Sequence, residues 1–206
     1  MDTKQEILNK TDALFMRYGI KSVTMDDIAR ELGISKKTLY QYVDNKQDLI
    51  EQIFQQHIQR DILAFKQIKE EAVDSIDEIL KVARYIIQTL RKVSPTTMYD
   101  LEKYYKKTWR QMKQLHNRYV YGLIMDNIQR GISEGFYRAS IKADIIAKLF
   151  VGCTTLLVDV DLFPMDKYNH EALVRQQIIY HVYGIASPQG LALLDDHLES
   201  NLNHID

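Results

Sequence analysis

The chain has 206 residues, of which 46% are hydrophobic and 27% are charged, and its formal net charge is −1 at pH 7. This length suffices for a full hydrophobic core, and the near-zero charge excludes a protein held to nucleic acid by bulk attraction alone. The single cysteine, Cys153, excludes an intramolecular disulfide and a cysteine-based metal cluster, and we expect it to be a small buried apolar residue.

Proline (3) and glycine (8) are scarce, which favours long helices over a β-sandwich with its many turns. The first residues show no basic segment followed by an apolar run, so no signal peptide is expected. No window approaches about 18 consecutive apolar residues, so no membrane span is expected either. A cytoplasmic location is the resulting prediction.

Helix starts in the first third of the chain are marked by side chains that satisfy the free amide groups of a first turn. Thr3 and Glu6 open a helix that Gly19 ends, and Thr24 and Asp27 open a short helix that Gly33 ends. Ser35 caps a third helix over 36–43. Asn45 caps a fourth helix that runs to about residue 70.

The rest of the chain continues the same pattern. A capping box at Ser75 opens a helix that Pro95 stops, and further helices are predicted within 98–105, from Trp109 to Gly135 and over 143–160. Asn169 caps the helix 170–186, and the tail after Pro188 is expected to hold one or two turns. No segment alternates as a strand does, so the predicted fold class is all-α.

Residues 25–43 form a helix, a glycine turn and a second helix, which is the pattern of a helix-turn-helix. On a wheel of about 100° per residue, Leu39 and Val43 define the buried side of the second helix. The opposite face is centred on Gln41, with Lys37 and Thr38 beside it and Tyr40 and Tyr42 at its flanks. Such a face suits the DNA major groove, where central side chains meet base edges and flanking ones reach phosphates. A merely solvated helix with half-buried tyrosines is the alternative reading.

The segment VTMDDIARELGISKKTLYQYVDNKQDLI, residues 23–50, resembles the N-terminal signature of the tetracycline-repressor (TetR) family of transcriptional regulators. The resemblance covers residues 3–50. Lys37 stands where a glycine is frequent, so base contacts there can differ, and Val43 stands where an aromatic residue is common. The resemblance implies DNA contacts by Lys36, Lys37, Thr38, Tyr40, Tyr42 and Lys46, with Thr24 at a phosphate. The N-cap Ser35 and the wheel position Gln41 complete the DNA-binding candidates.

The resemblance also implies how the chain is organised. Residues 1–47 would form the helix-turn-helix DNA-binding domain, and residues 48–206 a larger helical domain for effector binding and dimerisation. Such a protein is expected to be a homodimeric regulator, most simply a repressor, that binds a palindromic operator in double-stranded DNA. A small-molecule effector would release it.

A helical protein that binds a small molecule or an anion, without operator-specific DNA binding, is the alternative from another class. A gel shift on the DNA that flanks its own gene separates the two. The sequence shows no nucleophile–base pair and no phosphate-binding glycine loop, so no enzyme is expected. The six histidines lack metal-ligand spacing, so no metal and no cofactor are expected.

Ten of the thirteen tyrosines and the single tryptophan follow residue 50. Aromatic residues with polar tips can line an effector pocket, although each of them can equally be plain core. The resemblance implies such a pocket between the helices of the second domain. The candidate residues are Tyr85, Tyr104, Tyr105, Trp109, Tyr119 and Tyr121.

The helix predicted over 143–160 is apolar around nearly its whole circumference, which is more than one monomer core requires. The resemblance implies that this helix and the next form a four-helix interface with a second subunit. The candidate interface residues are Phe150, Val151, Cys153, Leu157, Ile178 and Val182.

The stretch 100–118 holds six basic and two acidic residues, a net charge of +4, interleaved with aromatic residues. It can be a second nucleic-acid surface, an anion site or the solvated side of two helices. The solvated side is the simplest of the three readings.

Overall fold

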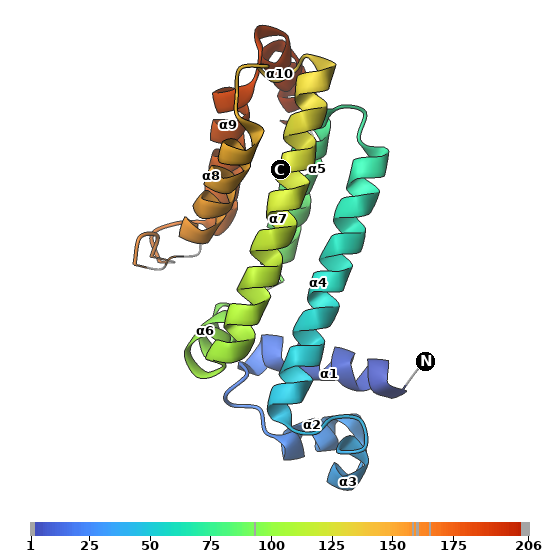
Figure 1. Ribbon diagram of the computed structural model, residues 1–206. Coiled ribbons are helices and arrows are strands. Elements are labelled where there is room, and N and C mark those ends of the chain that lie inside the picture. Colours follow the sequence, from blue (N-terminus) through green and yellow to red (C-terminus); the bar gives the residue numbers. More distant parts are fainter. Residues whose placement is uncertain (1–2, 93, 158, 160, 165, 203–206) are drawn as a thin grey trace. The chain divides into compact units, whose positions relative to one another are not determined.

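The computed structural model describes residues 3–92, 94–157, 159, 161–164 and 166–202 (Figure 1). The described chain folds into the helices α1 (Thr3–Tyr18), α2 (Met25–Leu32), α3 (Lys36–Leu39), α4 (Lys46–Glu71), α5 (Ser75–Leu90), α6 (Pro95–Tyr104), α7 (Lys106–Glu134), α8 (Ala143–Leu156), α9 (His170–Ile185) and α10 (Pro188–Leu202). The all-α prediction is confirmed, since the described residues add only one isolated β-bridge, Tyr137 to Ala186. None of the helices within the described ranges has the length and hydropathy that a bilayer crossing requires.

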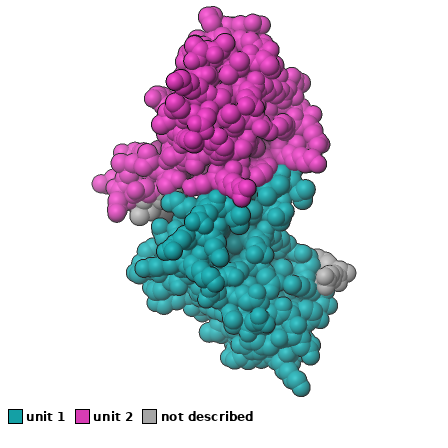
Figure 2. Space-filling view, viewed as in Figure 1, with its two compact units in different colours: residues 1–63, 92–116 teal, residues 64–91, 117–206 magenta. Residues whose placement is uncertain are grey.

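The chain forms two compact units, each made of two separate stretches of sequence (Figure 2). Unit 1 comprises Met1–Leu63 and Lys92–His116, and unit 2 comprises Ala64–Arg91 and Asn117–Asp206. The division follows packing density. The predicted boundary between residues 47 and 48 separates two functions, DNA binding and effector binding. A division by packing does not test it, so it stays a prediction.

Unit 1 packs α1, α2 and α3 with the start of α4 and with α6 around one apolar core. All five elements contribute side chains that are at most 1% exposed: Ile7, Phe15, Ile28, Leu39, Leu49, Ile50 and Leu101. Burying one such side chain stabilises the fold by about 1.5–3 kcal/mol. The short α2 and α3 hold their positions through this shared core, since helices of eight and four residues are not stable alone.

Local capping in unit 1 follows the predictions closely. The Thr24 hydroxyl accepts from the Asp27 amide at 3.2 Å, and the Asp27 carboxylate accepts from the Thr24 amide at 2.9 Å. Gly33 ends α2 with φ +66°, a left-handed conformation that glycine adopts without strain. The Asn45 side chain accepts from the Asp48 amide at 3.0 Å. These caps set where the helix-turn-helix begins and ends.

The third helix is shorter than predicted. The α-helical hydrogen bonding of α3 stops at Leu39 rather than at Val43. The Gln41 amide then donates to Thr38 and the Tyr42 amide to Leu39, each at 3.1 Å, which are the tighter i to i−3 bonds of a turn. The uniform wheel therefore describes residues 36–39 but not 40–42.

Several later boundaries also differ from the predictions. Asp74, not Ser75, caps α5, because its carboxylate accepts from the amides of Ile76 and Asp77 at 2.8 and 2.7 Å. Helix α5 ends at Leu90 without a proline, and Pro95 instead begins α6. Helix α7 begins at Lys106, three residues before the predicted start.

The C-terminal boundaries need two further corrections. Helix α8 ends at Leu156, and residues 158 and 160 of the predicted helix lie outside the described residues. The tail forms α10, a helix of 15 residues, where only one or two turns were expected. Leu194 of α10 is fully buried, so packing within the unit 2 core extends this helix beyond its local signals.

Unit 2 packs α5, α8, α9 and α10 with the longer part of α7 around a second apolar core. A buried polar network lies beside this core. The Tyr137 hydroxyl donates to the Asn127 side chain at 3.1 Å, and Asn127 donates to the Ser75 carbonyl at 2.8 Å. The Glu78 carboxylate, only 2% exposed, pairs with Arg130 at 3.2 Å. This network ties the start of α5 to α7.

Candidate nucleic-acid interface

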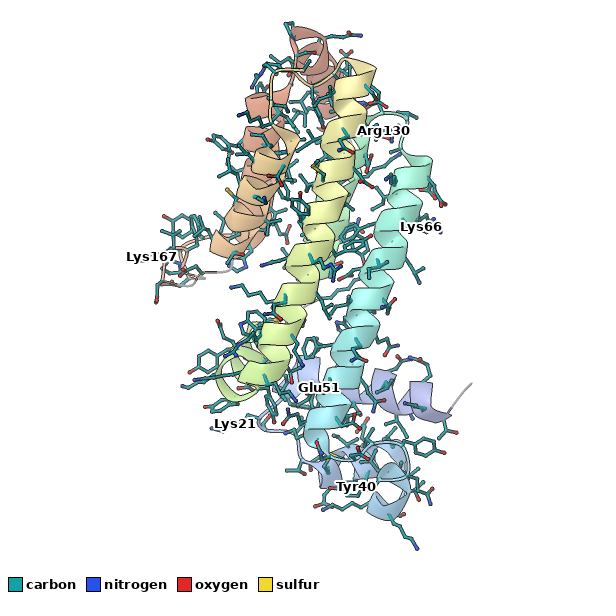
Figure 3. All side chains as sticks on the ribbon, in the orientation of Figure 1. Lys21, Tyr40, Glu51, Lys66, Arg130 and Lys167 are labelled. Atoms are coloured by element: carbon teal, nitrogen blue, oxygen red, sulfur yellow. The ribbon has the colours of Figure 1, made fainter. Side chains whose placement is uncertain are left out.

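The second helix of the helix-turn-helix presents one apolar and one polar face, as its sequence predicts. Leu39 is fully buried and Val43 is 3% exposed, so both enter the unit 1 core. Lys37, Tyr40 and Gln41 are exposed, and Tyr40 is 44% exposed (Figure 3). The hydroxyl of Ser35 accepts from the Thr38 amide at 3.0 Å and fixes the start of the helix. Three of the predicted base-reading or flanking side chains are thus open to a ligand.

Two further candidates are exposed but already have partners. Lys36 donates to Asp26 at 3.0 Å, and this hydrogen bond raises the pKa of the Lys36 ammonium. Thr24 is exposed, yet its hydroxyl donates to Asp27 at 2.6 Å as part of the cap. A phosphate would compete with a carboxylate at either position. The Lys36–Asp26 ion pair, which joins α3 to α2, was not predicted from the sequence.

Lys46, another predicted DNA contact, also has an intramolecular partner. Its ammonium group donates to the carbonyl of Ile20 at 2.5 Å and lies 5.9 Å from the centre of the Phe15 ring. Burial lowers the pKa of Lys46. In this arrangement Lys46 joins α4 to the turn between α1 and α2. Tyr42 is likewise half-buried and packs against the unit 1 core.

Helix α6 is bound to α1 and to the turn after it by contacts that were not predicted from the sequence. The Thr97 hydroxyl donates to the Phe15 carbonyl at 2.5 Å, and the Asp100 carboxylate accepts from the Lys21 amide at 2.7 Å. The partners are separated by 82 and 79 residues. No local sequence pattern predicts contacts between residues so far apart. The end of α1 and the turn after it are therefore held by residues far along the chain.

The six aromatic candidates for an effector pocket fall into both units. In unit 1, Tyr105 and Trp109 pack against the core, and Tyr104 accepts a hydrogen bond from Lys21 at 3.1 Å. In unit 2, the rings of Tyr85 and Tyr119 lie 5.2 and 5.9 Å from the ring of Phe65. Tyr121 donates to Asp144 at 2.8 Å. Tyr85 and Tyr119 are brought together through Phe65, which was not among the predicted pocket residues.

A surface depression of about 530 Å³ lies elsewhere, in unit 1. It contains none of the six aromatic candidates. Its walls come from the end of α1, the following turn and α2: Leu14, Tyr18, Ser22, Val23, Asp27, Arg30 and Glu31.

The six interface candidates divide by burial. Phe150, Ile178 and Val182 are at most 5% exposed and belong to the unit 2 core of the single chain. Val151, Cys153 and Leu157 are partly exposed. Large apolar side chains with greater exposure lie on the same two helices: Ile145, Leu149 and Leu156 on α8, and Tyr180 and Tyr183 on α9.

Comparisons with known proteins agree with the helix-turn-helix. Residues 7–53 match the family model described as bacterial regulatory proteins, tetR family. An HTH-type transcriptional regulator of Staphylococcus aureus (strain bovine RF122 / ET3-1) is 35% identical over 89 residues, which cover 43% of this chain and 48% of the relative. A second one, from strain USA300, is 31% identical over 87 residues, covering 42% and 47%. The chain thus spans about half the length of the curated relatives it matches.

Solved structures share the fold over most of the chain. A TetR-family transcriptional regulator from Agrobacterium tumefaciens superposes with a TM-score of 0.69 at 16% identity, covering 90% of this chain and 98% of that one. The fatty acid degradation regulator FadR from Bacillus halodurans gives a TM-score of 0.69 at 17% identity, covering 88% and 95%. The N-terminal part of the chain is thus that of a TetR-family regulator, and most of the chain shares the fold of solved TetR-family structures.

Proposed function

We propose that the protein is a homodimeric transcriptional repressor that binds a palindromic operator in double-stranded DNA and leaves it when a small-molecule effector binds. The observation that carries the proposal is the exposed face of α3 and its following turn, formed by Lys37, Tyr40 and Gln41. The buried Leu39 on the reverse side keeps this face pointed outward. A regulator that acts on bacterial DNA works in the cytoplasm.

The base-reading residues would be Lys37, Thr38 and Gln41. A glutamine amide can pair bidentately with adenine, and a threonine methyl can contact a thymine methyl. Tyr40 would reach a phosphate from the flank of this face, and Lys36 would do so by exchanging Asp26 for the DNA backbone. Lys46 would contribute mainly by fixing the α1–α2 turn, because its ammonium group is engaged with Ile20.

Dimerisation would use the exposed apolar stripes of α8 and α9. Ile145, Leu149 and Leu156 recur at helical spacing on α8, and Leu149 is 60% exposed. Tyr180 on α9 is 74% exposed. Contiguous exposed apolar side chains of this kind mark protein–protein contacts. The buried candidates Phe150, Ile178 and Val182 would support these stripes from beneath rather than touch the second subunit.

Release by an effector would be a shift between two populations of the dimer, one whose α3 helices fit the operator and one whose helices do not. The ligand must bind the second population more tightly. The aromatic group of Tyr85, Tyr119 and Phe65 is the part of unit 2 best suited to an apolar ligand with a polar edge. Helix α6 would act on the DNA-binding helices through Thr97 and Asp100.

Selection from a pool of random DNA duplexes tests the proposal without knowledge of the regulated gene. The purified protein is mixed with the pool at about 0.15 M salt, and bound duplexes are recovered and sequenced over several rounds. We expect enrichment of one motif with twofold symmetry. Recovery of duplexes without any enriched motif would reject operator-specific binding and favour a helical ligand-binding protein.

A further inference from the structure

A dense group of cations and tyrosines lies on α6, on the first turns of α7 and on the turn between α1 and α2. We call it the α6–α7 basic surface, formed by Lys21, Tyr99, Lys103, Tyr104, Lys106, Lys107 and Arg110. All seven side chains are exposed, and Tyr99 and Tyr104 are 54% and 44% exposed. All seven belong to unit 1. The proposed readout by α3 uses none of them.

The tyrosine rings hold two of these cations in place. The Lys21 ammonium donates to the Tyr104 hydroxyl at 3.1 Å and lies 4.4 Å from the centre of that ring. The Lys103 ammonium donates to the Tyr99 hydroxyl and lies 4.9 and 5.7 Å from the centres of the Tyr99 and Tyr104 rings. Cation–π contacts of this kind restrict long side chains without neutralising their charge. The positive charge is therefore positioned before any ligand arrives.

These cations also lack the acidic partners that other cations of unit 1 have. Lys10, Arg30 and Lys36 each form an ion pair with a carboxylate. Within the described residues, no such ion pair is formed by Lys21, Lys103, Lys106, Lys107 or Arg110.

The acidic residues of α6 do not neutralise the positive charge of this surface. Asp100 is 6% exposed and its carboxylate accepts from the Lys21 amide, so it faces inward. Glu102 is the exposed acid of the segment. Over residues 99–110, four exposed cations thus accompany one exposed carboxylate. A surface with such an excess of positive charge attracts a polyanion.

The position of the surface indicates which polyanion. It lies in the same compact unit as the helix-turn-helix, and Lys21 belongs to the turn that leads directly to Thr24 and α2. The same compact unit therefore carries both this surface and the residues proposed to contact DNA phosphates. DNA presents about one phosphate charge per 1.7 Å of its axis, and lysine, arginine and tyrosine side chains are common phosphate ligands. An anionic membrane would instead require an inserted apolar face, and the only large apolar side chains on this surface are two tyrosines whose hydroxyls bond lysines.

We propose that the α6–α7 basic surface binds the backbone of DNA flanking the half-site that α3 reads, so that each subunit contacts a longer duplex than the recognition helix alone requires. This inference rests on the proposed operator binding. It adds a second contact that depends on the length and charge of the duplex and not on its base sequence.

The test compares two duplexes that carry the selected operator motif. The minimal duplex ends at the motif, and the extended one carries about 10 additional base pairs of fixed sequence on each side. The test variant combines Lys103→Gln, Lys106→Gln, Lys107→Gln and Arg110→Gln. We expect the wild-type protein to bind the extended duplex about tenfold more tightly at low salt, and the variant to lose this advantage while binding the minimal duplex as before. Two phosphate contacts per subunit would steepen the dependence of log K on log salt by about 1.8 per subunit.

A matched control removes four exposed cations from unit 2 by the changes Lys66→Gln, Lys142→Gln, Lys167→Gln and Arg175→Gln. Thermal melting checks that both variants fold. The control should keep the wild-type preference for the extended duplex. A control that loses it equally would assign the effect to net charge and overturn the proposal.

The remaining outcomes are also decisive. A wild-type protein that binds both duplexes equally overturns the flanking contact but leaves the proposed operator binding intact. A wild-type protein that binds neither duplex removes the proposed function and this inference together. Wild-type cosedimentation with vesicles rich in phosphatidylglycerol, lost in the test variant while its DNA binding is unchanged, would assign the surface to a membrane instead.

Discussion

The helix-turn-helix of unit 1 and the start of α5 in unit 2 place their polar groups in opposite ways. In the first, caps link residues three apart, such as Thr24 and Asp27, and these side chains remain exposed or half-exposed. In the second, buried polar groups meet across 52 to 62 residues, as with Glu78 and Arg130 or Tyr137 and Ser75. The boundaries of the helix-turn-helix are thus set mainly by contacts between residues close in sequence. The start of α5 is instead held by polar contacts with residues far along the chain, Arg130 and Tyr137.

The exposed apolar stripe of α8 gives the largest expected effect. Leu149→Glu would place an unpaired carboxylate in the proposed subunit contact, at a cost of several kcal/mol where desolvation is complete. The variant should elute as a monomer in size-exclusion chromatography. Leu63→Glu, at a leucine of α4 that is 66% exposed, is the matched control and should leave the dimer unchanged. A dimeric Leu149→Glu protein would move the interface away from α8.

Two glycines of α7 occupy a crowded site and an open site in the same helix, so alanine substitutions at the two can be compared. A Cβ on Gly131 would lie 2.1 Å from the buried Tyr137 ring, whereas a Cβ on Gly122 would meet nothing within 4 Å. We expect Gly131→Ala to lower the free energy of unfolding by about 2 kcal/mol through overpacking. Gly122→Ala should raise it by about 0.5–1 kcal/mol, since alanine favours the helix. Urea denaturation measures both, and equal effects at the two sites would refute the close packing of Tyr137.

Lowering the pH should destabilise unit 2, because the folded protein buries His181 in its neutral form. This histidine is 9% exposed, packs 4.8 Å from the Phe150 ring, and its Nε2 has no hydrogen-bond partner among the described residues. Burial lowers its pKa from 6.5 to about 4. Between these two values the unfolded chain binds the proton and the folded chain does not, so stability falls as the pH drops.

From pH 7 to pH 5 the loss due to His181 should be about 2 kcal/mol. His181→Leu removes this contribution and leaves that of other groups in place. The difference in unfolding free energy between wild type and variant should therefore change by that amount over this pH range. A difference that is independent of pH would show that His181 takes up a proton in the folded protein.

The smallest expected change concerns the link between α6 and α1. Thr97→Val removes the hydroxyl that donates to Phe15 and keeps the shape of the side chain. The Phe15 carbonyl still accepts from the Gly19 amide at 2.9 Å, so the loss of stability should be only about 1 kcal/mol. If this link carries the effector signal, the variant should bind DNA but respond less to the effector. A variant with wild-type release would exclude Thr97 from the signal.

Sequence patterns predicted the N-terminal part of the fold well because its signals are local. Thr24, Gly33 and Asn45 each act within a few residues, and each was confirmed as a helix boundary. The patterns failed where distant packing decides the outcome. Helix α10 continues because Leu194 enters the unit 2 core. The error at α5 was local instead, since Asp74 rather than the adjacent Ser75 caps this helix.

The same limit applies to the candidate site. Lys37, Tyr40 and Gln41 are exposed as predicted, although the α-helix ends at Leu39, because the buried Leu39 and Val43 still fix the inner side of the segment. The engagement of Lys46 with Ile20 spans 26 residues, and no spacing rule anticipates it. The direct roles of all these residues in DNA binding stay predictions.

The most direct test of the account is a scan of the selected operator, one base pair at a time, with the wild-type and Gln41→Ala proteins. Each bidentate contact to a base contributes about 1–3 kcal/mol of discrimination. A dimer should show this loss at two symmetric positions, in half-sites about 34–36 Å apart from centre to centre. The account predicts that Gln41→Ala flattens the preference at those two positions and leaves the others intact. An unchanged profile would remove Gln41 from the readout, and a profile without twofold symmetry would contradict a dimer on a palindrome.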